Sequence, residues 1–488
     1  MQAFVSLAVV KNGLLLLCWL LPFWAFAQVV EISNPGKLPA KASKFRVIGK
    51  NNDGIIVRLY GLEDVINVYT DDLVLSSSKT IDFKNKDGLL QYIMLNKTGA
   101  VIFYLQQDRK YSVLFAQPVN SKFIEIGKPI SVDTIYDRRD LVEQNLRFKP
   151  STDQNYLFIY YPFFAGNSVQ TVRYICLDRG LNKVYNTTLP FSRDESEMET
   201  AKTLVDNNGA SYMILRKQDK EPGSTFDVYS VNSSGEPVYY SLHTDKKVFG
   251  DAYLDIDNKN GKLLLTALYD DELKRGEAVA NGLLYATYDP VSGKPDQQAV
   301  IPFQKSFISE LTGREVKDQG SLYTFNIKRA MLRNDGGMLL LAESFIKDTR
   351  ESSVPLGLQP GYSSFQTTNL YQFNDIIGFS VNPKGEIDWS AILRKKQVSE
   401  DDNGAYSSFL IMNQKDKLRL LYLDDVTNAG ALNQYILGSD GINERNTILN
   451  QEDRDIMLLP KTGKQIAPDA LVLPSYKNGV LRLVKLTF

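Results

Sequence analysis

Histidine and cysteine are almost absent from this chain. Its 488 residues include one histidine, His243, and two cysteines. Catalytic triads and zinc centres built on several histidines or cysteines need more of these residues than the chain contains. No phosphate-binding loop, dinucleotide-binding glycine pattern or nucleophile elbow is found either. The sequence therefore predicts no catalytic residue, no metal site and no cofactor.

The two cysteines are not expected to pair with each other. Cys18 lies in an N-terminal apolar segment that we expect to be removed, which leaves Cys176 within the apolar stretch VRYICL. Without a disulfide, stability must come from a large packed core, and Cys176 is predicted to be a small buried residue of that core.

An excess of charge of either sign is also missing. Lys and Arg number 56 and Asp and Glu 57, for a formal net charge of −1. The basic residues are scattered along the sequence, which predicts no basic groove. Neither nucleic acid nor an anionic membrane is therefore expected as a partner.

The N-terminal segment has the pattern of a secretory signal peptide. Lys11 is the only charge before the apolar run from Leu14 to Phe26, and small residues stand at Ala25 and Ala27. The run is shorter than the roughly 20 residues of a spanning helix, so we predict cleavage after Ala27 and no transmembrane segment afterwards. The expected division is a signal peptide at 1–27 and one domain at 28–488, secreted or in the periplasm or outer cell envelope.

A strand–turn–strand phrase recurs along the rest of the chain. DNNG at 206–209 precedes ASYMILRK, NKNG at 258–261 precedes KLLLTALY, and RNDGG at 333–337 precedes MLLLAESF. NQKDK at 413–417 and YKNG at 476–479 precede similar apolar stretches, and a second hairpin usually follows. Two hairpins make a four-stranded antiparallel sheet that cannot bury both of its faces alone. Such units must stack, which predicts the blades of a β-propeller.

Seven complete units and one further hairpin are present. The units span 45–83, 90–131, 145–191, 200–242, 252–303, 326–393 and 406–449, and the last hairpin spans 471–488. An exposed sheet edge is a liability, and VVEIS at 29–33 offers a strand to that hairpin. We therefore predict an all-β fold with a single β-propeller of four-stranded antiparallel blades, eight in number, the last closed by the two termini. Seven blades, or two smaller β-domains in series, are the alternatives.

Connections of unequal length distinguish the two faces of such a propeller. The first-to-second and third-to-fourth strand turns are short, whereas long connections are expected at 302–325, 347–369 and 394–405. The two classes lie on opposite faces, and long loops on a rigid scaffold are where binding usually resides. The longest stretch, KDTRESSVPLGLQPGYSSFQTT at 347–368, holds Tyr362 and Phe365 as candidate ligand-binding aromatics.

Three pairs of carboxylates are expected on the same face, because each ends a second strand or lies in a connection between units. The pairs are Asp270 and Asp271, Asp401 and Asp402, and Asp424 and Asp425. Such a rim suits a cation or a basic peptide, or the acid and base of a glycosidase. Asp at a strand end is also ordinary turn chemistry.

One part of the sequence shows a more specific resemblance than the recurring strand–turn–strand pattern. NDGGMLLLAESF at 334–345, YQFNDIIGFSVNPKGEIDWSAILRKKQ at 371–397 and AYSSFLIMN at 405–413 resemble a segment of an uncharacterised family of secreted, propeller-like proteins of Bacteroidetes-type bacteria. The resemblance implies a bacterial envelope or extracellular setting and supplies no catalytic residues. Within it, Gly385 is expected to turn a hairpin and Trp389 to pack between blades.

Binding is the function that these features favour. We expect an exported, non-catalytic β-propeller that binds a protein, peptide or glycan on its long-loop face. A carboxylate-dependent carbohydrate-active enzyme and a structural or assembly component of the envelope are the alternatives. Three carboxylates converging in the central channel would favour the enzyme, and a stable stoichiometric partner would favour the envelope component.

Overall fold

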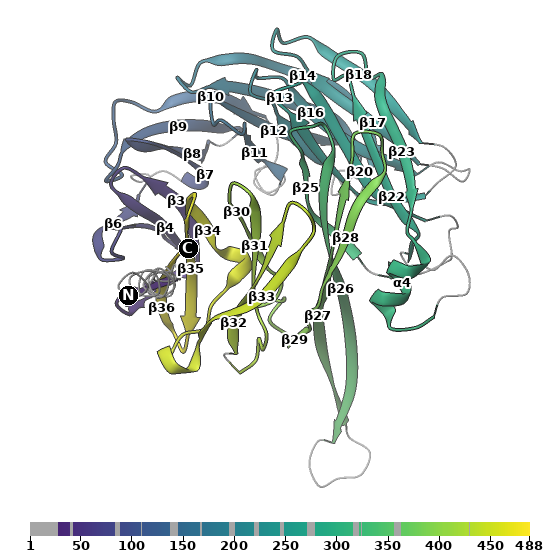
Figure 1. Cartoon of the computed structure of the whole chain (residues 1–488). Coiled ribbons are helices and arrows are strands. Elements are labelled where there is room, and N and C mark those ends of the chain that lie inside the picture. Colours follow the sequence, from purple (N-terminus) through teal and green to yellow (C-terminus); the bar gives the residue numbers. More distant parts are fainter. Residues whose placement is uncertain are drawn as a thin grey trace, which may run out of the picture.

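Eight four-stranded antiparallel sheets lie around a central axis as the blades of a β-propeller in the computed structural model (Figure 1). The structure describes residues 28–488 except 40–41, 83–87, 109, 137–144, 166–167, 195–200, 219–223, 245–247, 271–278, 316–321, 324, 356–362 and 429. The predicted signal peptide, 1–27, thus lies outside the described residues. The prediction of an all-β propeller with eight blades is confirmed.

Blades 1 to 4 are continuous segments whose first strand lies at the axis, where first strands of neighbouring blades contact one another. Blade 1 comprises β3 (Ala42–Asn51), β4 (Gly54–Gly61), β5 (Asp64–Tyr69) and β6 (Leu75–Ile81). Blade 2 comprises β7 (Gly88–Asn96), β8 (Gly99–Gln107), β9 (Ser112–Asn120) and β10 (Ile130–Ile135). Blade 3 comprises β11 (Arg147–Pro150), β12 (Tyr156–Ala165), β13 (Ser168–Asp178) and β14 (Lys183–Asp194). Blade 4 comprises β15 (Lys202–Val205), β16 (Ser211–Gln218), β17 (Ser224–Val231) and β18 (Pro237–Thr244).

Blades 5 to 7 repeat this order and carry the insertions. Blade 5 comprises β19 (Val248–Asp257), β20 (Lys262–Asp270), β22 (Gly282–Tyr288) and β23 (Pro295–Pro302). Blade 6 comprises β25 (Phe325–Leu332), β26 (Met338–Pro355), β27 (Ser363–Val381) and β28 (Ile387–Leu393), with β29 (Gln397–Glu400) also paired to β27. Blade 7 comprises β30 (Leu410–Asn413), β31 (Lys417–Leu423), β32 (Ala431–Gly438) and β33 (Asn443–Asn450). The connection between β20 and β22 of blade 5 contains β21 (Val279–Ala280), which pairs with β24 (Leu322–Tyr323). Between blades lie β24, the helix α4 (Lys305–Thr312), and the short helices η1 (Glu452–Arg454) and η2 (Pro460–Thr462).

Blade 8 is closed by the two termini, as predicted. Its strands from the axis outward are β34 (Lys464–Ala467), β35 (Ala470–Lys477), β36 (Val480–Thr487) and β1 (Val29–Ile32), and β2 (Gly36–Lys37) also pairs with β36. In Figure 1 the purple first blade therefore lies beside the yellow last blade. The role expected for YKNG at 476–479 was wrong. That turn joins the second and third strands of its blade, because the innermost strand, β34, lies upstream of the predicted hairpin.

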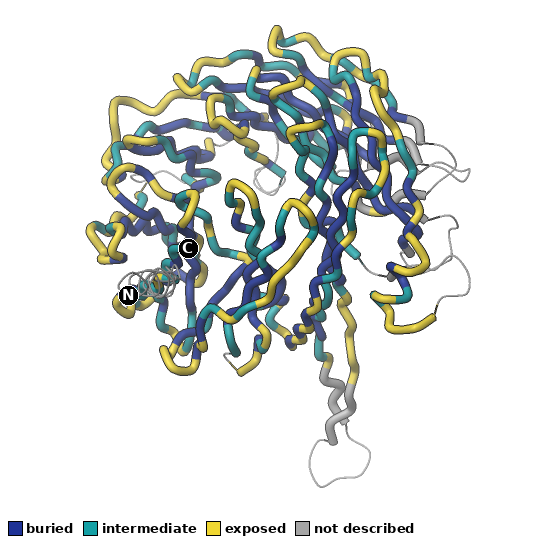
Figure 2. Tube along the Cα trace, in the orientation of Figure 1, coloured by how far each residue is buried: buried dark blue, intermediate teal, exposed yellow. Residues whose placement is uncertain are grey.

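The core consists of eight clusters of apolar side chains, one at each interface between neighbouring blades. In β20, Leu263 and Leu265 pack towards blade 4, whereas Leu264 packs towards blade 6. Second strands are therefore apolar at consecutive positions, since both faces of each blade are covered. Figure 2 shows this buried ring in dark blue. Cys176 is fully buried in it, as predicted, and burial raises the pKa of its thiol to about 12.

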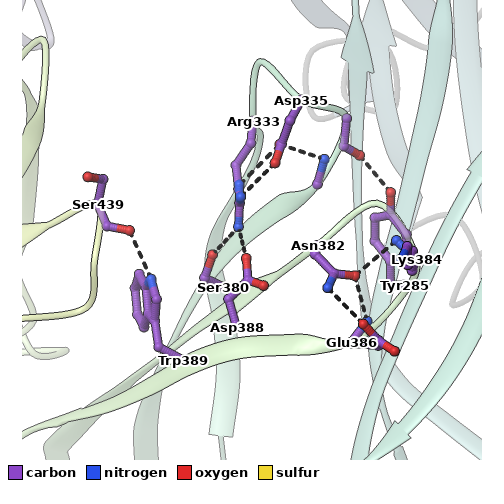
Figure 3. Close-up of polar contacts among 12 residues, drawn as sticks. Tyr285, Arg333, Asp335, Ser380, Asn382, Lys384, Glu386, Asp388, Trp389 and Ser439 are labelled. Carbon is purple, nitrogen blue, oxygen red and sulfur yellow. Dashed lines mark hydrogen bonds and ion pairs between the residues drawn. The ribbon is translucent and has the colours of Figure 1, made fainter.

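The turns of blade 6 fasten it to both neighbours (Figure 3). Gly385 has a φ of 82° and lies so close to blade 5 that an added Cβ would stand 2.3 Å from the Cβ of Ala299. On the other side, the indole N–H of Trp389 donates to the carbonyl of Ser439 in blade 7 at 2.9 Å. Both residues thus have the structural roles expected from the sequence.

Candidate functional site

The connections of the propeller divide between two faces. Since strands within a blade are antiparallel, the second-to-third strand connections lie on the same face as the connections between blades. We call this the long-loop face, and the opposite one the short-turn face. The long connections predicted at 302–325 and 394–405 both lie on the long-loop face, where they contain α4 and β29 respectively.

The third predicted long loop is instead mostly a β-ribbon, so that prediction was wrong. Strands β26 and β27 continue their pairing from Lys347 opposite Tyr371 to Pro355 opposite Ser363. The ribbon projects far from the blade (Figure 1). Its residues from Lys347 to Glu351 are all exposed, so no alternation of apolar and polar residues marks the strand in the sequence.

Asp401 and Asp402 lie on the long-loop face and shape the turn that follows β29. A carboxylate oxygen of Asp401 accepts the backbone N–H of Asn369 at 2.9 Å. A carboxylate oxygen of Asp402 accepts the hydroxyl of Ser399 at 2.6 Å and the N–H of Gly404 at 2.7 Å. Such hydrogen bonds stabilise a turn, which is the ordinary role of Asp at the end of a strand.

Asp424 and Asp425 begin the second-to-third strand connection of blade 7. The carboxylate of Asp425 accepts the hydroxyl of Thr427 at 2.7 Å, the N–H of Thr427 at 2.8 Å and the side-chain amide of Asn428 at 2.9 Å. These hydrogen bonds, led by that from the Thr427 hydroxyl, lower the pKa of Asp425 to about 2. A carboxyl group this acidic is ionised near neutral pH and is poorly suited to act as a general acid.

The Asp425 turn yields a pH-dependent stability prediction. Because the folded pKa lies below the ordinary value of 3.8, the stabilisation is complete above about pH 4 and is lost as pH falls towards 2. Asp425→Ala should reduce the free energy of unfolding by about 1 kcal/mol at pH 7, measured with urea. The difference from wild type should shrink below pH 4. Asp416→Ala, in an exposed turn, is the control, and an equal loss in both variants would contradict the prediction.

The other four predicted site residues are only partly described. Asp270 ends β20 and Phe365 lies in the ribbon strand β27, where the backbone alone is described, and Asp271 and Tyr362 fall outside the described residues. Among the residues whose placement is described, no group of three or more His, Cys, Asp or Glu side chains is arranged to hold a metal ion. The structure does not assemble the predicted carboxylates into one centre within that part of the chain.

A pocket that the sequence did not predict opens between blades 6 and 7. It has a volume of about 720 Å³ and is bordered by the innermost strands of both blades, β25 and β30. Phe345, Phe373 and Phe409 supply apolar wall, and Lys328 and Lys461 supply positive charge. Lys461 comes from the connection between blades 7 and 8, so the pocket faces the long-loop side of the axis.

A buried ion pair underlies this pocket. The side chains of Glu343 and Lys395 are both 0% exposed, and their charged atoms are 2.7 Å apart. The other carboxylate oxygen of Glu343 accepts the hydroxyl of Ser408 at 2.6 Å and lies 3.1 Å from the ammonium of Lys328. Because Ser408 precedes blade 7, this network joins blades 6 and 7 beneath the pocket.

Two hydrogen bonds donated by the ammonium of Lys395 complete the network. Lys395 donates to the carbonyl of Phe373 and to the side-chain oxygen of Gln397, both at 2.9 Å. Burial lowers the pKa of Lys395, and the adjacent Glu343 carboxylate opposes that shift. A buried cation is tolerated when it is paired and hydrogen-bonded in this way.

Phe373 lies between the charged groups that line the opening. The ammonium of Lys328 is 5.5 Å, and that of Lys461 5.8 Å, from the centre of its ring, within the range of cation–π attraction. Lys461 also donates to the carbonyl of Gly404. Desolvation lowers the pKa of Lys461, whereas the nearby Asp402 carboxylate acts to raise it. The predicted residue Asp402 is thus electrostatically linked to the pocket.

One feature of the sequence points to this network. Glu343 interrupts the apolar stretch MLLLAESF of a second strand, and second strands are covered on both faces. A carboxylate there must be paired, yet the partner, Lys395, lies beyond β28 and no spacing rule identifies it.

Comparisons with known proteins give only distant structural matches. Neither a protein-family model nor a curated protein sequence matches the chain. The chain is similar to the polysaccharide lyase Uly1, with 9% identity, a TM-score of 0.41 and coverage of 92% of this chain and 99% of that one. It is also similar to the WD40 domain of SCAP from fission yeast (9% identity, TM-score 0.42, 95% and 98% covered). A protein of unknown function from Bacteroides caccae is similar at 10% identity and a TM-score of 0.27 over 72% and 93%.

These likenesses are too distant to carry a function to this chain, because all three TM-scores are below 0.5. Within the described part of the chain, no helix has the length and apolar character needed to cross a membrane.

Proposed function

We propose that the protein is an exported, non-catalytic β-propeller that binds a protein, peptide or glycan on its long-loop face, with the pocket between blades 6 and 7 as the binding site. The placement of Lys328 and Lys461 around the ring of Phe373 in an open pocket carries this proposal. Export to the periplasm or cell exterior rests on the sequence at 1–27, and recovery outside the cytoplasm of a chain beginning at Gln28 tests it.

The chemistry of the pocket supports binding of an acidic group. Lys328 is partly exposed, at 30% of its side chain, so its ammonium can reach a ligand while it remains near Glu343. A negatively charged group beside Phe373 would be attracted by both ammonium groups, and an apolar or ring surface would contact the phenylalanines. Glu343 and Lys395 are sealed from solvent, which suits support of the pocket better than proton transfer to a ligand.

The test is the loss of ligand binding in a double variant, Lys328→Ala/Lys461→Ala. The purified mature chain is applied to arrays of defined oligosaccharides and peptides, with affinities then measured by calorimetry for the strongest binder. Removal of two charge-assisted contacts should weaken binding by roughly tenfold or more. Because Lys328 also pairs with the buried carboxylate of Glu343, the thermal midpoint of the double variant is measured as well, and a variant that remains folded at the assay temperature reports on binding alone.

Lys122→Ala/Lys384→Ala, at two exposed turns, removes the same charge elsewhere and should leave affinity unchanged. Equal affinity in the pocket variant and this control would contradict the proposed site. Recovery of the bound oligosaccharide in cleaved form would contradict the absence of catalysis. A partner that copurifies from native envelope at fixed stoichiometry, independent of the pocket lysines, would favour an envelope component instead.

A further inference from the structure

The basic residues of the chain, scattered in the sequence, gather along the axis of the propeller. The eight innermost strands carry nine Lys or Arg residues and three Asp residues. All three acids lie in β19 of blade 5, whereas the whole chain has 56 basic and 57 acidic residues. Basic residues that are scattered in the sequence can therefore lie near one another along the axis. Each blade contributes only its first strand to the axis, so these residues lie far apart in the sequence.

The axial cations are accessible and crowd one another. The flanks of the blades are covered by their neighbours, so exposed side chains of an inner strand, such as Arg46 and Lys149, project into the axial space. The pKa of Lys149 is lowered by desolvation, and also by the positive charges of Lys202 in blade 4 and Arg147 beside it in blade 3.

A second cavity lies at the short-turn end of the axis. It has a volume of about 530 Å³ and is lined by inner strands and turns of blades 8, 1, 2 and 3. Its basic residues are Lys97, Arg179 and Lys464, together with Lys50, whose ammonium is paired with the carboxylate of Asp71 at 2.7 Å. Its acid, Asp153, accepts hydrogen bonds from the hydroxyl of Ser151 at 2.6 Å and the side chain of Asn155 at 2.7 Å. The cavity therefore has an excess of positive charge.

An unsatisfied hydrogen-bond donor points to a ligand in this cavity. Asn51 lines the cavity and is 6% exposed, and its side-chain NH₂ has no hydrogen-bond partner among the described residues. Its side-chain oxygen is used by the backbone N–H groups of Asp53 and Gly54, which fixes the direction of the amide. A buried donor left unpaired costs roughly 1–3 kcal/mol, and a bound acceptor would remove that cost.

We propose that the axial wall and the short-turn cavity bind an acidic glycan, an oligosaccharide that carries carboxylate or sulfate groups. This inference goes beyond the proposed function, because it places a site at the end of the axis opposite the pocket between blades 6 and 7. The acidic groups would lie against Lys97, Arg179 and Lys464, and a ring hydroxyl would accept from Asn51. Arg46 would continue the basic surface along the axis.

The neutral lining favours a glycan over an acidic peptide. Asn52, Asn96 and Gln154 line the cavity with Asn51, and a side-chain amide both donates and accepts, as the hydroxyls of a sugar ring require. Tyr92, also in the lining, stacks on Phe148 with ring centres 5.0 Å apart and an interplanar angle of 10°. Such a rigid aromatic pair provides a flat apolar surface beside the amides.

The experiment measures the affinity of the mature chain for oligogalacturonate, for a sulfated dextran, for neutral dextran and for polyglutamate, at two salt concentrations. We expect one or both acidic glycans to bind and neutral dextran not to bind. Lys97→Ser/Lys464→Ser should weaken binding roughly tenfold or more and make it less dependent on salt. Asn51→Asp should weaken it as well, since it adds a repelling charge, and Lys122→Ser/Lys384→Ser should not.

Four results would overturn the inference. Binding of neutral dextran as tightly as the acidic glycans would exclude charge recognition, and preferential binding of polyglutamate would assign the site to an acidic peptide. Absence of binding by both acidic glycans would remove the site altogether. Loss of acidic-glycan binding in Lys328→Ala/Lys461→Ala but not in Lys97→Ser/Lys464→Ser would also refute the axial site, while leaving the proposed function of the long-loop pocket intact.

Discussion

Replacing Lys395 with methionine is expected to destabilise the propeller by about 3–5 kcal/mol, as is typical when one partner of a buried ion pair is removed. Glu343 would keep its charge at 0% exposure and would retain Ser408 and the partly exposed Lys328 as partners. The carbonyl of Phe373 and the side chain of Gln397 would lose a donor. Urea unfolding of the wild type and the variant at pH 7 measures the difference in free energy of unfolding. Protection of the Ser408 amide from hydrogen exchange shows whether the loss of stability begins at the pocket.

Lys396→Met is the matched control, since Lys396 is the exposed neighbour of the buried lysine and should change stability by less than about 0.5 kcal/mol. The double variant Glu343→Leu/Lys395→Met removes both charges and should be more stable than Lys395→Met alone, because no buried charge is then left without its partner. If Lys395→Met and Lys396→Met were equally stable, the pair would not be buried as the structure places it.

The architecture of this protein was predictable because its strands repeat a local pattern. Runs such as LLL at 263–265 are apolar at every position, since consecutive side chains pack on opposite neighbours, and Gly or Asn lies at or near the turn that follows the first strand of blades 1 to 7. The need to cover the edge of the last hairpin then indicated that VVEIS at 29–33 closes the ring. These predictions need only the local pattern of apolar and turn residues and the requirement that sheet edges be covered.

Elements without a buried face were not predictable in the same way. The innermost strand β34, with the sequence KQIA, is too short and polar to stand out from a connection. The ribbon residues from Lys347 to Glu351 are all exposed, so this part of β26 has no apolar period. The predicted strand boundaries and connections were therefore wrong where a strand contacts solvent rather than a neighbouring blade.

The polar sites were hidden for a different reason. Glu343 lies in β26 and Lys395 follows β28, while Arg46, Lys149, Lys202 and the other axial cations come from the innermost strands of five different blades. The carboxylate pairs, by contrast, were conspicuous as neighbours in the sequence, and the described ones shape turns. In a propeller, residues that meet at the axis belong to different blades and lie far apart in the sequence. Polar residues that are neighbours in the sequence therefore tend to form turns rather than binding sites.

Removal of residues 28–33 from the mature chain should lower its free energy of unfolding by about 3–5 kcal/mol, since the outermost strand of blade 8 would be lost. β1 pairs with β36 from Val29 opposite Thr487 to Ile32 opposite Val484, and Ser33 exchanges hydrogen bonds with Leu483 at 2.9 Å. Without it, β36 would become an exposed edge and the cluster between blades 7 and 8 would lose the side chains of Val30 and Ile32.

The decisive measurement is rescue of the shortened chain by the missing strand. A synthetic peptide of residues 28–38 added to the shortened protein should raise its thermal midpoint towards that of the full mature chain, because the peptide can pair with the free edge of β36. Glu31→Ala in the full chain, which removes only the partly exposed ion pair with Lys485 at 2.8 Å, should change stability by less than about 1 kcal/mol. An unchanged midpoint after the deletion would mean that the ring is closed by the other blades alone. A destabilised protein that the peptide fails to rescue would mean that residues 28–33 act through contacts other than the edge of β36.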